Sequence, residues 1–139
     1  EAVTQSASKF GFIRTIKGRK CRFDKWEPMT FGMNQAMNYN EAKAEYGNNI
    51  RRAFTYKALN RLIQGSAADQ AKQAMIDCYN AGFMPMLQIH DELCFSIYGD
   101  DDIMKIKKEM ENSIENLRVP FKVDVAQGLS WGETHDNDK

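Results

Sequence analysis

Apolar and basic residues alternate along residues 10–26, FGFIRTIKGRKCRFDKW. The alternation has the period of a β-strand, and Lys17-Gly18 supplies a turn between two such segments. The pattern therefore predicts a hairpin, and its expected exposed residues are Arg14, Lys17, Arg19, Lys20 and Arg22. Basic residues interleaved with aromatic ones suit a phosphate backbone, and they equally suit an edge hairpin that keeps the protein soluble.

Residues 27–50 are rich in Asn and Met and carry turn signals at Pro28, Gly32 and Gly47. They are expected to form a connector with a short helix over residues 39–46. No chemistry is assigned to this segment.

A long helical segment is expected from Arg51 to Asn80, as one helix or as two with a break near Gly65-Ser66. Gly82 would end it. The small residues from Gly65 to Ala68 permit the close approach of another backbone, either a strand or a bound ligand. Residues at helical spacing predict the buried face: Leu59, Ile63, Ala67, Ala71 and Met75.

Two strand-like runs, Met84–Leu87 and Leu93–Tyr98, flank the turn His90-Asp91-Glu92. The acids at 100–102 suit the N-cap and first turn of a helix. An amphipathic pattern then predicts about four helical turns from Ile103 to Leu117, followed by a last strand over 121–125. This order predicts an α+β fold: an antiparallel sheet with helices on one face.

Composition and charge narrow the class of protein. The chain of 139 residues is one domain or a piece of a larger one, and it opens on Glu1 rather than Met. Residues 1–64 hold twelve Lys/Arg and five Asp/Glu, a net charge of +7, whereas residues 65–139 hold seven and fourteen, a net charge of −7. A basic half favours a polyanionic partner.

No apolar run approaches the ~20 residues that span a membrane, and no leader is visible. The three cysteines form no CxxC pair, which argues against a disulfide framework and indicates a reducing compartment.

The acids at the predicted turn have several interpretations. Adjacent carboxylates beside apolar residues repel one another, and a hard cation such as Mg²⁺ would relieve that repulsion and support phosphoryl transfer. A solvated turn explains the same residues, as does a general acid or base centred on His90. A zinc site is disfavoured, because only His135 supplies a second histidine.

Three stretches together resemble family A DNA polymerases. MLQIHDELCF (Met86–Phe95) resembles motif C of that family, and KALNRLIQGSAADQAKQAMI (Lys57–Ile76) resembles its palm helix. GFIRTIKGRK resembles the segment that follows the fingers, and Trp131 and His135 resemble the C-terminal ending. The pieces occur in the family's order over residues 9–135.

The resemblance implies a partial polymerase palm in which the motif-C hairpin packs on helices. Residues 1–139 would be a C-terminal palm segment, with a post-fingers hairpin over 1–26, a variable connector over 27–50 and the palm core over 51–139. Residues 65–69 would pack against the motif-C hairpin, which would explain their small side chains.

The resemblance also implies site residues. Asp91 matches a catalytic aspartate that binds two Mg²⁺ ions, and Glu92 matches its neighbouring carboxylate in a supporting role. His90, Gln64 and Asn60 match residues near the primer terminus and the duplex. Tyr56 stands where the family commonly has a DNA-contacting arginine, and Leu62 stands where it often has proline. The expected substitutes for that arginine are Arg52, Lys57 and Arg61. Together with Arg19 of the hairpin, they complete the expected DNA-binding set.

The family's other metal-binding aspartate and its fingers helix are absent from the sequence. The chain is therefore expected to be inactive alone. It would need the remainder of the polymerase, in the same or a separate chain, to act on primer–template DNA and dNTPs. The expected location is the cytoplasm of a bacterial or phage-infected cell. Two alternatives remain: a non-catalytic DNA-binding relic or split-subunit interaction module, and an interaction protein whose charges form a solvated surface.

Overall fold

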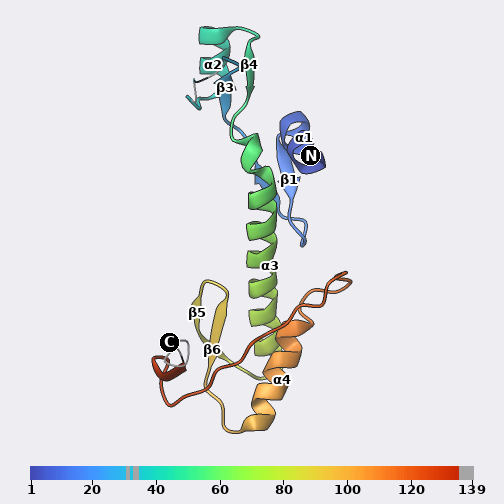
Figure 1. Ribbon diagram of the computed structural model, residues 1–139, viewed down its shortest axis with the longest axis vertical. Helices are drawn as coiled ribbons and strands as arrows, with labels where there is room; N and C mark the ends of the chain where they lie inside the picture. Colours follow the sequence, from blue (N-terminus) through green and yellow to red (C-terminus); the bar gives the residue numbers. More distant parts are fainter. Residues whose placement is uncertain (31, 33–34, 135–139) are drawn as a thin grey trace. The chain divides into compact units, whose positions relative to one another are not determined.

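The computed structural model describes residues 1–30, 32 and 35–134. The chain divides into two compact units, Glu1–Asp69 and Gln70–Lys139. Helix α3 (Ala58–Asn80) begins in the first unit and ends in the second (Figure 1).

A helix followed by a hairpin opens the first unit. Helix α1 (Ala2–Phe10) leads into strands β1 (Phe12–Arg14) and β2 (Lys20–Arg22), which pair antiparallel with Ile13 opposite Cys21. The predicted hairpin around Lys17-Gly18 is thus confirmed, with shorter strands. Its inner face belongs to a small buried core made of Ala7, Ile13, Phe23 and Ala58, with Val3, Cys21, Phe54 and Leu62 packed against it.

The segment expected to be a connector carries regular structure. Strand β3 (Trp26–Pro28) pairs antiparallel with β4 (Ile50–Arg52), and helix α2 (Tyr39–Tyr46) confirms the predicted short helix. The buried Glu27 accepts a hydrogen bond from Arg51 Nε at 2.8 Å across the strand pair. The two strands were not predicted, because each has only three residues and their pairing depends on a non-local contact.

Helix α3 is continuous, so the alternative of one helix is confirmed and the alternative with a break near Gly65-Ser66 is wrong. The helix also begins later than predicted, because Arg51 and Arg52 pair with β3 and a 3₁₀ turn, η1 (Thr55–Lys57), intervenes. Its predicted end is confirmed: Gly82 has φ +94°, and the following N–H of Phe83 donates to the carbonyl oxygen of Cys78 at 2.9 Å.

The predicted buried face of α3 is largely wrong. Leu59 and Ile63 are 52% and 59% exposed, and Ala67 is exposed as well. Of the expected set only Ala71 is buried, and Met75 is partly covered. The buried residues of α3 are mostly small: Ala58, Asp69, Ala71, Ala74 and Cys78. Helical spacing identifies which residues share a face, whereas burial depends on which neighbours approach that face.

The second unit contains the end of α3, a hairpin and helix α4 (Asp100–Glu111). Strands β5 (Pro85–Ile89) and β6 (Glu92–Phe95) form the hairpin. The acids 100–102 occupy the first turn of α4, as predicted, but the helix ends at Glu111 instead of continuing to Leu117. The side-chain amide of Gln70 donates to Ser113 Oγ at 3.1 Å and ties α3 to the chain after α4.

The fold is a mixture of helices and small antiparallel sheets. The predicted α+β class is confirmed, but the single sheet is not: the described residues form three separate two-stranded pairs. The strand expected over 121–125 does not form, because no strand of the described residues pairs with it; the N–H of Val123 donates instead to Glu111 Oε1 at 3.1 Å. Among the helices built from described residues, none has the length and apolar content to cross a membrane.

Candidate functional site

The turn between β5 and β6 presents Asp91 to solvent. Ile89 lies opposite Glu92 in the register, so the loop contains only His90 and Asp91. His90 adopts a left-handed φ of +53°, which is uncommon for a residue other than glycine. Both loop side chains are exposed. The expectation of three turn residues is therefore corrected: Glu92 is the first residue of β6.

Glu92 has different surroundings from its neighbour. It is half-buried, and its Oε1 accepts a hydrogen bond from the indole Nε1 of Trp131 at 3.0 Å. The thiol of Cys94 lies 3.6 Å from the same oxygen, and burial together with the Glu92 carboxylate raises the pKa of that thiol. His135, the other residue of the expected C-terminal ending, lies outside the described residues.

The donors at this turn are of the kind that Mg²⁺ prefers. Mg²⁺ is typically held by one or two carboxylates, together with water and the phosphates of a substrate. Asp91 and Glu92 supply two adjacent carboxylates, and Asp91 is exposed at the tip. Within the described part of the chain, histidine, cysteine and acidic side chains nowhere gather in a group of three or more that would enclose an ion. The pair thus fits a metal site shared with a substrate.

A second group of candidate residues lies at the start of α3. Asn60 and Gln64 are one helical turn apart and exposed, and Lys57 precedes them by one further turn. The guanidinium of Arg61 lies 5.0 Å from the ring centre of Phe23. The structure therefore places Lys57 in η1 and the other three candidates in the first turns of α3, where Asn60 and Gln64 are exposed and Arg61 is partly covered.

The two remaining candidates, Arg19 and Arg52, contact the protein itself. Arg52 Nη1 donates to the carbonyl oxygen of Phe23 at 3.0 Å, and its guanidinium lies 4.7 Å from the centre of the Trp26 rings. Arg19 Nε forms an ion pair with Asp69 at 2.8 Å. Both guanidinium groups thus stabilise the first unit.

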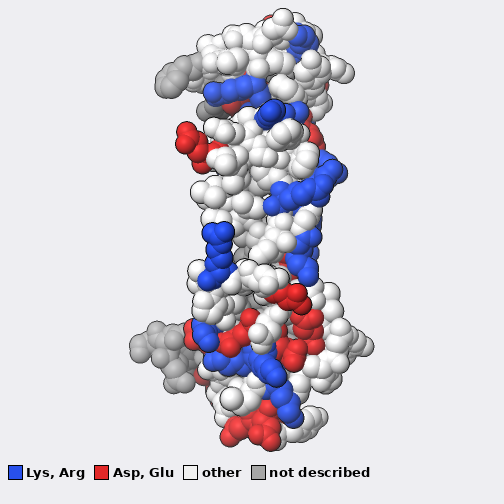
Figure 2. Space-filling view, turned by 90° about the vertical axis from the view of Figure 1, so that its right-hand side faces the viewer, with Lys and Arg blue, Asp and Glu red and all other residues white. Residues whose placement is uncertain are grey.

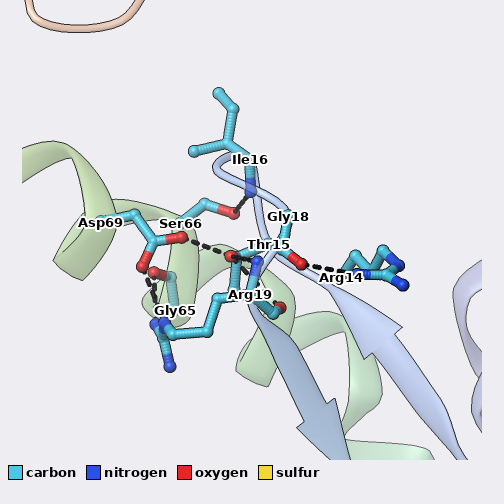
Figure 3. Close-up of polar contacts among 8 residues, drawn as sticks. All are labelled: Arg14, Thr15, Ile16, Gly18, Arg19, Gly65, Ser66 and Asp69. Atoms are coloured by element: carbon cyan, nitrogen blue, oxygen red, sulfur yellow. Dashed lines mark hydrogen bonds and ion pairs between the residues drawn. The ribbon is translucent and has the colours of Figure 1, made fainter.

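Asp69 is the centre of a polar cluster between the β1–β2 turn and α3 (Figure 3). Its buried carboxylate accepts hydrogen bonds from the hydroxyl of Thr15 and from Arg19. Arg19 also donates to the carbonyl oxygen of Gly65 at 3.0 Å, and the N–H of Ile16 donates to Ser66 Oγ at 3.1 Å. Burial alone raises the pKa of Asp69, but the hydrogen bonds from Thr15 and Arg19 and the charge of Arg19 outweigh it and hold the pKa below its ordinary value.

In this cluster residues 65–69 contact the β1–β2 turn, and the expectation that they pack against the motif-C hairpin stays a prediction. A Cβ on Gly65 would lie 2.8 Å from Thr15 Cγ2, so the small side chain is needed where the β1–β2 turn approaches α3. The run of small residues correctly indicated a close backbone approach. Sequence reasoning missed the roles of Thr15 and Asp69, although an acid on an otherwise small helix face was a signal that a basic partner lies nearby.

The candidate residues therefore form one group on α3 in the first unit and one at the β5–β6 turn in the second. The division of charge along the sequence is also visible in space-filling view. On the face drawn in Figure 2, Lys and Arg prevail over the first unit, whereas Asp and Glu gather over the second with Lys and Arg among them.

Comparison with known proteins identifies the family of the chain. The model of DNA polymerase family A matches residues 1–133. The chain is 37% identical over 134 residues to a DNA-directed DNA polymerase of Pseudomonas phage M6, covering 96% of this chain and 17% of that protein. It is 44% identical over 95 residues to DNA polymerase I of Caldicellulosiruptor bescii, covering 62% of this chain and 11% of that protein.

A solved structure agrees with these relatives. The polymerase domain of Pol1 from M. smegmatis, in complex with DNA primer–template and dNTP, matches 94% of this chain with a TM-score of 0.63 and 31% identity. This chain covers 21% of that domain and so corresponds to only a part of it. The chain belongs to DNA polymerase family A.

Proposed function

We propose that this chain is the C-terminal palm part of a DNA-directed DNA polymerase, which adds nucleotides to a primer 3′-hydroxyl under the direction of a template. The observation that carries the proposal is the exposed carboxylate of Asp91 at the tip of a two-residue turn, in a chain of this family. An acid held at the end of a paired hairpin is well placed to meet a substrate that approaches from solvent.

Asp91 would hold divalent metal together with substrate phosphates, and Glu92 would support it from the first position of β6. When bound, two Mg²⁺ ions lower the pKa of the attacking hydroxyl and stabilise the charge on the departing pyrophosphate. The indole of Trp131 fixes Glu92 Oε1, so the two carboxylates have different freedom. This difference supports Asp91 as the catalytic ligand and Glu92 as the supporting one.

Primer–template DNA would contact the exposed start of α3 and His90. The side-chain amides of Asn60 and Gln64 can donate to the minor-groove acceptors that correctly paired bases share, so they would test the shape of the new pair rather than its sequence. Lys57 and Arg61 would add positive charge beside them. Because Arg19 and Arg52 are engaged within the first unit, we propose that they support this surface by holding the neighbouring segments in place.

The remainder of the polymerase would complete the site. The chain spans about a sixth of the phage relative (17%), so the second metal-binding aspartate and the fingers would come from residues elsewhere in the same or a separate chain. A neighbouring coding sequence with those motifs would favour a polymerase divided between two chains.

Primer extension tests the proposal directly. The purified chain is incubated with a labelled primer–template, dNTPs and Mg²⁺, alone and after copurification with the polypeptide that carries the remaining polymerase motifs. We expect no extension by the chain alone and Mg²⁺-dependent extension by the pair. Extension by the chain alone, abolished by Asp91→Ala, would contradict the requirement for a remainder.

The excess of basic residues in the first unit supports a second candidate, a DNA-binding polymerase relic without catalysis. It predicts salt-sensitive DNA binding that is indifferent to Asp91→Ala, and no extension even when the remaining part is supplied.

A further inference from the structure

The chain after α4 returns to the β5–β6 hairpin and forms a short turn over residues 128–134, which we call the C-terminal turn (Figure 1). Glu133 Oε2 accepts a hydrogen bond from the N–H of Leu129 at 2.8 Å. The hydroxyl of Thr134 donates to the carbonyl oxygen of Trp131 at 2.7 Å. These local hydrogen bonds fix the backbone that carries Trp131.

The indole of Trp131 reaches from the C-terminal turn to the β5–β6 hairpin. Its Nε1–H donates to Glu92 Oε1 at 3.0 Å, although the two residues are 39 positions apart in the chain. Indole carries a single N–H, so the direction of that group is set by the acceptor that it meets. The N–H is therefore directed at a carboxylate of the candidate metal site, even though the Trp131 side chain is 49% exposed.

Cys94 provides a second donor to the same oxygen. Alternate residues of a strand project to the same side, so Cys94 follows Glu92 on one side of β6. Its Sγ lies 3.6 Å from Glu92 Oε1, and a thiol S–H is a weak hydrogen-bond donor. A carboxylate oxygen offers about two lone pairs to donors. Two donors from two segments of the chain therefore hold Glu92 Oε1.

The orientation of Glu92 is thus set before any cation is present. A glutamate side chain has several rotatable bonds, and ordering it costs conformational entropy. Groups that are ordered in advance bind with a smaller entropy cost. Residues that hold a metal-binding carboxylate from behind also determine how strongly it binds the ion.

We propose that Trp131 and Cys94 are positioning residues of the metal site: they hold the Glu92 carboxylate in one orientation beside Asp91, so that the acidic pair receives a divalent cation without rearrangement. The inference rests on the proposed function for the identity of the cation. Neither positioning residue needs to touch the ion or the substrate. A purely structural role, in which both contacts only attach the C-terminal turn, is the alternative that the experiments must separate.

Binding of Mn²⁺ to the full chain, measured from the electron paramagnetic resonance signal of the free ion, tests the role of Trp131 without catalysis. Mn²⁺ prefers the same octahedral oxygen ligands as Mg²⁺. Trp131→Phe retains an aromatic ring and removes the N–H. The matched control, Trp26→Phe, makes the same change in the first unit. Asp91→Asn measures how much Mn²⁺ binds elsewhere on the chain, and circular dichroism verifies that each variant is folded.

Trp131→Phe should weaken the Asp91-dependent binding of Mn²⁺ about tenfold. Loss of a residue that holds a metal ligand typically costs about 10-fold to 100-fold in affinity, and the half-exposed indole places the effect at the lower end. Trp26→Phe should bind as the wild type does. Unchanged affinity in Trp131→Phe, or an equal loss in Trp26→Phe, would overturn the proposal.

Two replacements of Cys94 separate its donor from its packing. Cys94→Ala removes the donor and should weaken Mn²⁺ binding, by less than Trp131→Phe does because a thiol is the weaker donor. Cys94→Ser keeps a hydroxyl donor and should bind more tightly than Cys94→Ala. Equal losses in the two variants would assign Cys94 to packing and overturn its positioning role.

The completed polymerase provides a second readout that a structural role would not change. In single-turnover primer extension, the Mg²⁺ concentration that gives half the maximal rate should rise about tenfold in Trp131→Phe. The dNTP concentration that gives half the maximal rate should stay the same. A purely structural role would lower the amplitude, which measures the fraction of active enzyme, and leave both concentrations unchanged. That result would overturn the proposal.

Failure of this inference and failure of the proposed function are distinguishable. Mn²⁺ binding that depends on Asp91 but is indifferent to Trp131→Phe would overturn the positioning role alone. Mn²⁺ binding that is indifferent to Asp91→Asn would overturn the metal site itself, and the positioning role with it. Absence of primer extension by the completed polymerase, with Mn²⁺ binding weakened by Trp131→Phe as expected, would overturn the catalytic proposal alone.

Discussion

Replacement of Asp69 by asparagine tests whether the polar cluster holds the hairpin on α3. Asparagine has nearly the same shape as aspartate but no charge. The change removes the ion pair with Arg19 at 2.8 Å and weakens the hydrogen bond from Thr15. Asp24→Asn is the matched control, because Asp24 is exposed and belongs to the same unit.

The magnitude follows from the burial of the two partners. A hydrogen bond to a charged group contributes about 1.5–3 kcal/mol when buried, but an exposed ion pair contributes only about 0–1 kcal/mol. The side chain of Arg19 is 52% exposed, so its contribution falls toward the lower range. Because Thr15 and Asp69 are both buried, we expect Asp69→Asn to lower the free energy of unfolding by about 2 kcal/mol near neutral pH. For Asp24→Asn the change should stay within about 0.5 kcal/mol.

The effect should depend on pH with a defined sign. The pKa of Asp69 in the folded protein lies below its ordinary value of 3.8. The unfolded chain therefore takes up a proton at higher pH than the folded protein does. The stabilisation is complete above the ordinary pKa and is lost as pH falls through the folded pKa. The difference in the free energy of unfolding between the wild type and Asp69→Asn should therefore shrink as pH falls.

Urea unfolding followed by far-UV circular dichroism, between pH 7 and pH 3, measures both quantities. A loss near 2 kcal/mol at pH 7 that declines below about pH 4 would support the reasoning. A loss equal to that of Asp24→Asn, or one that stays constant down to pH 3, would refute it.

Two further predictions follow from close packing and burial. Gly65→Ala would ordinarily stabilise a helix by about 1 kcal/mol, but the new Cβ would lie 2.8 Å from Thr15 Cγ2. Urea unfolding should therefore show a net loss of stability. A gain would show that the β1–β2 turn does not approach α3 so closely. Burial and the charges of Glu109 and Asp77 raise the pKa of the Cys78 thiol to about 11. Iodoacetamide at pH 8 should therefore alkylate the partly exposed Cys21 and Cys94 before Cys78. Peptide mass spectrometry measures the order of modification. Early modification of Cys78 would contradict its burial.

Local patterns in the sequence predicted the short elements well. Alternation and the glycine at 18 located the first hairpin, acids located the start of α4, and Gly82 located the end of α3. Each of these signals acts through residues that are neighbours in the chain. The turn at His90 and Asp91 was found for the same reason. Only Glu92 was wrongly assigned to the turn, since it is the first residue of β6.

Features that depend on distant residues were not predictable in this way. The pairing of β3 with β4 joins residues 24 positions apart, such as Glu27 and Arg51, and it shortens the predicted α3. The contact of Thr15 with Asp69 spans 54 positions and brings the first hairpin onto the small residues of α3. Leu59 and Ile63 have the spacing of a buried face, yet no local pattern reveals whether another part of the protein covers them.

The most direct test of the proposed catalytic role compares Asp91→Asn with Asp101→Asn in the polymerase completed by its remaining part. Asp101 is an exposed acid of α4, outside the proposed site, and it provides the same change of charge. Metal contacts stabilise the transition state by several kcal/mol, and about 1.4 kcal/mol corresponds to a tenfold change in rate. Single-turnover primer extension with Mg²⁺ should therefore be slowed about a hundredfold or more by Asp91→Asn and be unchanged by Asp101→Asn. Equal rates for Asp91→Asn and the wild type would contradict the assignment of Asp91 as the catalytic ligand.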